Sequence, residues 1–147
     1  MAADICCHFA SPPYQGIELQ QPGVHTVVTV NEVMGGPTTG TMLFSTVKFR
    51  NENPKLTAAM FAALKEAIEF INRDKRAAAE VYLQLSKEKT RPEEILAQLN
   101  DPALRFDLTP LNVMKYFDFM FNVGSIKVKP ASWKEIFAPE AQGLPGS

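Results

Sequence analysis

The chain has 147 residues, a length that fits one domain and can bury a hydrophobic core. Its 15 basic and 16 acidic residues give a formal net charge of -1. This balance argues against a nucleic-acid-binding surface and a polybasic membrane anchor, and no apolar run approaches the roughly 20 residues of a membrane-spanning helix.

Three segments in the first third of the sequence predict β-strands. Residues 5–10 form a short apolar run, residues 24–30 are rich in valine and threonine, and residues 40–47 are partly apolar. Turn signals separate the three segments at Gln21-Pro22-Gly23 and at Gly35-Gly36-Pro37.

The rest of the sequence predicts helices. Asn53-Pro54 marks the start of the first, in which apolar residues recur at helical spacing along one stripe: Leu56, Met60, Leu64, Ala67, Ile68 and Ile71. Further helices are predicted to start at Asp74, at capping boxes in residues 90–93 and 132–135, and at Thr109-Pro110.

These elements predict an α/β fold with about three strands and five to six helices. Residues 1–137 form its body. Residues 138–147 contain two prolines and two glycines and predict a flexible tail.

The sequence contains few residues that could perform catalysis. Its histidines are His8 and His25, and it has no nucleophile elbow, P-loop, dinucleotide-binding glycine motif or paired-histidine zinc motif. Cys6 and Cys7 are adjacent, which disfavours a disulfide between them, and together with His8 they lack the spacing of a zinc site. We therefore predict a protein that is not an enzyme and has no cofactor and no metal.

Three motifs carry a resemblance to a known family. They are His8-Phe9-Ala10-Ser11-Pro12-Pro13-Tyr14-Gln15, Gly35-Gly36-Pro37-Thr38-Thr39 and Lys129-Pro130-Ala131-Ser132-Trp133-Lys134-Glu135-Ile136-Phe137. In this order, with a helix-rich stretch between them, they resemble the C-terminal part of a solute-binding protein of an ABC importer. The branch includes sulfonate-, taurine-, nitrate- and thiamine-precursor-binding proteins, and the resemblance covers about residues 4–139.

The resemblance implies a helix-rich part of one lobe of a two-lobed periplasmic binding protein. Its function would be to capture a small organic anion, such as a sulfonate, nitrate or carboxylate, or a heteroaromatic precursor, and to deliver it to an ABC permease. It implies a periplasmic location, although the first seven residues do not have the composition of a signal peptide.

The candidate ligand-binding residues form two groups. His8, Ser11 and Tyr14 lie at and just after the first predicted strand, where ligands of open α/β sheets bind, and the resemblance places them beside the hinge. The resemblance places Gly36, Thr38 and Thr39 on a neighbouring loop facing the same cleft. Bland alternatives remain open: a buried histidine at position 8, helix capping by Ser11, and turn formation by the two threonines.

A different class of function is an alternative. The chain would then be a truncated, self-associating structural or interaction module that binds no solute. In either case an incomplete lobe exposes strand edges and apolar surface, which predicts a homodimer or another homo-oligomer.

Overall fold

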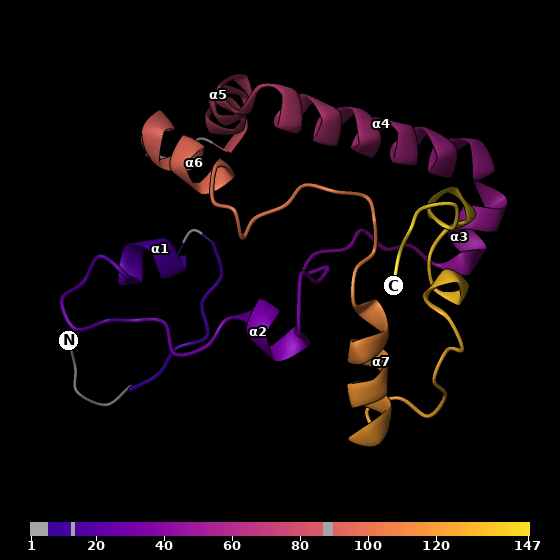
Figure 1. Ribbon diagram of the computed structural model, residues 1–147. Coiled ribbons are helices and arrows are strands. Elements are labelled where there is room, and N and C mark those ends of the chain that lie inside the picture. The colour runs from indigo at the N-terminus through magenta and orange to yellow at the C-terminus, as the bar shows by residue number, and fades with distance from the viewer. Residues whose placement is uncertain (1–5, 13, 87–89) are drawn as a thin grey trace.

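The computed structural model describes residues 6–12, 14–86 and 90–147. Helices α3, α4, α5 and α6 follow one another along one side of the molecule, and a long coil then returns beneath α4 to α7 (Figure 1). The elements in order are α1 (Tyr14–Glu18), α2 (Val30–Met34), α3 (Val47–Glu52), α4 (Pro54–Arg73), α5 (Lys75–Ser86), α6 (Pro92–Leu99), α7 (Val113–Asn122) and the 3-10 helices η1 (Trp133–Glu135) and η2 (Pro139–Ala141).

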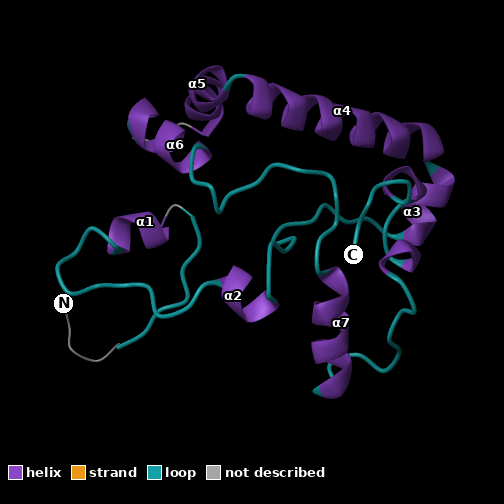
Figure 2. Cartoon of the chain, viewed as in Figure 1, coloured by secondary structure: helices purple, strands orange, loops and turns teal. Residues whose placement is uncertain are grey.

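The predicted α/β fold is wrong. The described residues contain no β-strand, and the segments between helices are coil and turns (Figure 2). Residues 6–10, 24–29 and 40–46 have no strand pairing, and Ile5 lies outside the described residues. A strand needs a second strand to bond its N–H and C=O groups, so composition alone cannot create one.

Local capping explains how two of the predicted strands end. Thr29 and Glu32 form a capping box that starts α2: the N–H of Glu32 donates to the Thr29 hydroxyl at 3.2 Å, and the N–H of Thr29 donates to the Glu32 carboxylate at 2.7 Å. Thr46 similarly accepts from the N–H of Phe49 at 3.1 Å and starts α3. Neither helix was predicted, because the valine-rich residues 24–30 and the partly apolar residues 40–47 were assigned to strands.

The longer helices were predicted with varying accuracy. The start of α4 after Asn53 is confirmed, as is the Asp74 cap of α5, which accepts from the N–H of Ala77 at 2.9 Å. Helix α6 starts after Arg91 rather than at a Thr90 capping box, and α7 starts after Asn112 rather than at Thr109.

Two small buried clusters hold the chain together. One lies where α5 packs on α6 and buries Ala78, Ala79 and Ile95. The other surrounds the start of α7 and buries Pro110, Val113, Trp133 and Ala141, with the ring of Phe137 edge-on to Trp133 at 5.8 Å between centroids.

The last ten residues contribute to the second cluster. The N–H of Ser147 donates to Pro110 at 2.9 Å, and the main-chain oxygen of Ser147 accepts from Val113 at 3.0 Å. Gly146 fits closely against the core, because a β-carbon there would meet the Trp133 ring at 2.8 Å and the Pro110 oxygen at 3.0 Å. The flexibility expected for residues 138–147 remains a prediction about motion, but the structure gives them defined contacts.

No helix within the described part of the chain has the length and apolar character needed to cross a bilayer. Helix α4 nevertheless carries a long apolar stripe and contains no fully buried residue.

Replacing Gly146 by alanine should destabilise the fold by about 1–3 kcal/mol, the usual cost of an overpacked site. The physical reason is the steric conflict between the added methyl group, the Trp133 ring and the Pro110 carbonyl. Urea unfolding followed by the fluorescence of Trp133, the one tryptophan in the sequence, measures the change. Gly143→Ala is the matched control, since nothing lies within 4 Å of its added β-carbon; equal stability of the two variants would contradict the close fit.

Candidate functional site

Residues 36–39 pass directly against the start of α7, and we call this contact the loop–α7 junction. It consists of Gly36, Thr38, Thr39, Leu111, Asn112, Lys115 and Tyr116. Helix α2 ends at Gly35 with φ +68, and Gly36 follows with φ +146. These angles favour glycine, so the two glycines turn the chain from α2 toward α7.

Thr39 and Leu111 form a reciprocal pair of hydrogen bonds across the junction. The N–H of Thr39 donates to the Leu111 carbonyl at 3.0 Å, and the N–H of Leu111 donates to the Thr39 hydroxyl at 2.9 Å. The Thr38 hydroxyl lies 3.4 Å from the Leu111 carbonyl and 3.5 Å from the Tyr116 hydroxyl. Thr39 is therefore structural, whereas Thr38 and Tyr116 make only long contacts and can exchange them for others.

Two side chains of the α7 region extend the junction toward α2. The Asn112 amide donates to the Pro37 carbonyl at 2.8 Å, and Asn112 adopts a left-handed conformation with φ 54, which asparagine tolerates. The Lys115 ammonium donates to the Met34 carbonyl, at the end of α2. Because an ammonium has three N–H donors and Lys115 is exposed, donors remain for another acceptor.

The remaining predicted residues, His8, Ser11 and Tyr14, gather separately around α1. His8 Nδ1 lies 2.7 Å from Glu18 Oε1, and the Ser11 carbonyl accepts from the N–H of Tyr14 at 2.9 Å. Tyr14 is 63% exposed. Figure 1 shows α1 well apart from α7, and no hydrogen bond or ion pair among the described residues joins the two groups.

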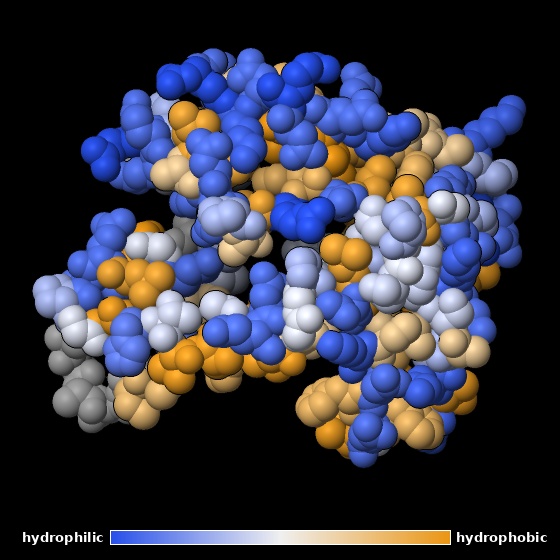
Figure 3. Space-filling view, viewed as in Figure 1, coloured by the Kyte–Doolittle hydropathy of each residue, from blue (hydrophilic) through white to orange (hydrophobic). Residues whose placement is uncertain are grey.

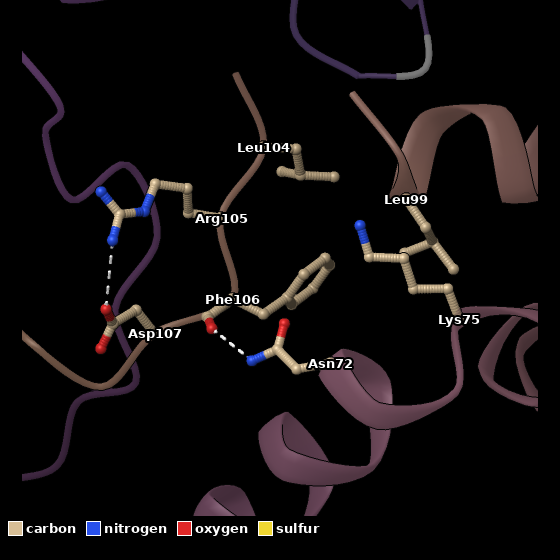
Figure 4. A pocket seen from close by; sticks show the side chains of 7 residues that line it. All are labelled: Asn72, Lys75, Leu99, Leu104, Arg105, Phe106 and Asp107. Carbon is tan, nitrogen blue, oxygen red and sulfur yellow. Dashed lines mark hydrogen bonds and ion pairs between the residues drawn. The ribbon is translucent and has the colours of Figure 1, made fainter. Parts of the chain in front are cut away.

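A shallow hollow of about 280 Å³ lies between α4, α5, α6 and the coil that follows α6. Its lining is shown in Figure 4: Asn72, Lys75, Leu99, Leu104, Arg105, Phe106 and Asp107. The amide of Asn72 donates to the Phe106 carbonyl at 3.0 Å and holds the coil on α4. No motif in the sequence predicted this hollow.

Charge pairing within the coil limits what the hollow can bind. Arg105 lies 3.6 Å from Asp107, and both point away from Lys75 across the backbone (Figure 4). A hydrogen bond from the N–H of Thr109, at 2.8 Å, holds the pKa of Asp107 below its ordinary value of 3.8; Arg105 adds to the effect and partial burial opposes it. With Arg105 paired, the hollow has one cation, Lys75, without an ion pair among the described residues.

The described residues contain no group of three or more histidine, cysteine, aspartate or glutamate side chains placed to hold a metal ion. Cys6 and Cys7 are exposed free thiols.

Comparison of the chain with protein-family models, curated proteins and solved structures found no match.

The junction contains three of the six residues predicted to bind a ligand, and the group around α1 contains the other three. Sequence reasoning missed Leu111, Asn112, Lys115 and Tyr116, because their approach to the loop spans more than seventy residues. The one local signal for these residues was Asn112. It comes directly before the apolar stripe of α7, and asparagine tolerates the left-handed backbone conformation that this residue adopts at the N-cap.

Replacing Thr39 by valine should lower the free energy of unfolding by about 1–2 kcal/mol, because the N–H of Leu111 loses its acceptor. Urea unfolding monitored by Trp133 fluorescence gives the difference. Thr39→Ser keeps the hydroxyl and is the matched control. A loss in Thr39→Val no larger than that in Thr39→Ser would show that the hydroxyl does not stabilise the junction.

Asp107 should titrate below pH 3.8 in the folded protein, as measured by NMR of its carboxyl carbon. Because the folded-state pKa is lowered, the stabilising contribution is complete above the unfolded-state value and disappears as the pH falls through the folded-state value. Arg105→Gln should leave most of the decrease in place, since the Thr109 N–H is the larger cause. A folded-state pKa at or above 3.8 would contradict the hydrogen bond.

Proposed function

We propose that the chain supplies one wall of a binding site for a small organic anion or heteroaromatic solute, within an assembly that another polypeptide completes. The loop–α7 junction is the wall. The observation that supports it is that the contact between residues 34–39 and the first turn of α7 carries the Thr38 and Tyr116 hydroxyls, 3.5 Å apart, and the Lys115 ammonium, which bonds to Met34. The resemblance adds the biological setting, which is delivery of the solute to an ABC permease from the periplasm.

The donors available to a solute are side chains rather than the helix terminus. The N–H groups of Asn112 and Val113, at the start of α7, already bond to Ser147 at 3.0 Å each. The Lys115 ammonium and the Tyr116 hydroxyl remain, one charged and one neutral. This pair suits a sulfonate or carboxylate, whose oxygens accept several hydrogen bonds at once.

The need for another polypeptide follows from the surface area. The accessible surface is 11494 Å². A compact folded monomer of 16.3 kDa is expected to expose about 7500 Å². The excess means that this chain alone leaves much surface uncovered. A small ligand also needs a concave site that encloses most of its surface, and an exposed wall does not provide one.

The isolated chain should bind taurine, nitrate or small aromatic carboxylates only weakly, with dissociation constants of about 1 mM or higher. NMR titration should shift the amide signals of Thr38, Lys115 and Tyr116. Lys115→Gln should weaken binding several-fold, whereas Lys127→Gln, which removes an exposed charge outside the junction, should not.

Two results would contradict this function. No shift at the junction with any of these solutes would remove the wall from consideration. A dissociation constant of about 1 μM or lower would show a complete site in the isolated chain.

A second candidate function, a self-associating interaction module, is favoured by α4. This helix has 20 residues, none of them buried, and its Leu56 and Met60 side chains are 49% and 39% exposed. The earlier argument from strand edges no longer applies, because no strand exists among the described residues. The argument from exposed apolar surface remains, and α4 supplies that surface.

A further inference from the structure

Helix α4 has an apolar stripe that its own chain leaves open. Leu56, Met60, Ala63 and Ala67 recur at intervals of three or four residues, and all four are exposed. The neighbouring face, with Thr57, Phe61 and Ile68, is half-buried and turns toward the rest of the chain. In Figure 3 hydrophobic residues lie along the lower side of the α4 region, beneath hydrophilic ones.

We propose that two copies of this chain associate through antiparallel pairing of their α4 helices. The inference rests on the interaction-module function and adds the partner, the surface and the register. It does not depend on solute binding.

The order of large and small side chains fits an antiparallel pair. Leu56 and Ala67 lie equally far on either side of a midpoint between Phe61 and Ala62, and so do Met60 and Ala63. An antiparallel partner with this midpoint therefore places Leu56 opposite Ala67 of the second copy and Met60 opposite Ala63 of the second copy. Each large side chain meets a small one, which lets the two helices approach closely without a void.

The charges beside the stripe are self-complementary in the same register. Lys55 and Glu66 flank the same side of the stripe, are exposed, and have no ion-pair partner among the described residues. The other two charges of this stretch, Lys65 and Glu69, lie 3.9 Å apart and pair within the helix. Antiparallel pairing brings each Lys55 within one helical turn of Glu66 of the other copy, giving two reciprocal ion pairs.

Parallel pairing would leave these charges unpaired. A two-fold axis along the helices would place the side of one helix that carries Lys55 and Glu66 across the contact from the same side of the other helix, so that neither charge would meet its partner. The charge pattern therefore selects antiparallel pairing and favours a second copy of this chain as the partner, because the same surface complements itself about a two-fold axis.

The predicted dimer is weak. Twenty helical residues extend over about 30 Å, and a contact between two such helices buries less than the area of a standard stable interface. We expect a dissociation constant of about 1–100 μM.

Sedimentation equilibrium over about 5–500 μM tests the proposal. The wild-type chain should change from 16.3 kDa toward twice that mass as its concentration rises. Lys55→Glu and Glu66→Lys should each weaken self-association roughly tenfold, because both ion pairs become like-charge contacts. Lys127→Glu makes the same charge change outside α4 and should have no effect, and circular dichroism verifies that each variant is folded.

The decisive measurement is an equimolar mixture of Lys55→Glu and Glu66→Lys chains. In a dimer of the two unlike chains, the glutamate introduced at position 55 of one meets the lysine introduced at position 66 of the other, and Glu66 of the first meets Lys55 of the second. Both ion pairs are then present, one of them with its charges exchanged, so the mixture should recover wild-type dimerisation. Failure to recover it would overturn the register. A wild-type dimer that neither substitution weakens would overturn α4 pairing and leave the interaction-module function standing. A wild-type chain that stays monomeric at about 500 μM would overturn both, and would leave α4 as a surface for a different polypeptide.

Discussion

The backbone of Leu111 is the point at which the first and last thirds of the chain are joined. Thr39 satisfies both its N–H and its C=O, and the preceding Pro110 and the nearby Val113 are buried. Ser147 then bonds Pro110 and Val113. Because a segment held this way cannot continue a helix, α7 starts at Val113 rather than at Thr109, and Lys115 and Tyr116 near its start contact Met34 and Thr38.

Local rules predicted the parts of the structure that depend on local contacts. The caps at Asp74 and Ser132 use side chains that bond to N–H groups two or three residues away, and both are present. The capping box at Thr29 obeys the same rule, but valine content was given more weight there and a strand was predicted. Strands and the contacts of the junction depend on partners far away in the sequence. The resemblance suggested Thr38 and Thr39 as ligand-binding residues, which stays a prediction, whereas the contact of Tyr116 with Thr38, 78 residues away, could not be predicted from spacing.

The two uncovered features of the chain lie on different elements. Helix α4 lies on one side of the molecule and α7 on the other, with the coil after α6 passing between them (Figure 1). Pairing through α4 therefore does not use the loop–α7 junction, so self-association and solute binding are compatible. Pairing through α4 would cover one part of the exposed surface, and a polypeptide on the loop–α7 junction would cover another.

The proposed binding of a solute at the junction would depend on assembly. Two unit charges 4 Å apart attract by about 1 kcal/mol in bulk water and by about 4 kcal/mol at the effective dielectric constant of a partly enclosed site. Lys115 is exposed, so its attraction for an anion is near the lower value in the isolated chain. A polypeptide that covers the junction and excludes water would raise that attraction without adding any contact of its own. The affinity of the proposed wall would therefore be set less by Thr38, Lys115 and Tyr116 than by what covers them.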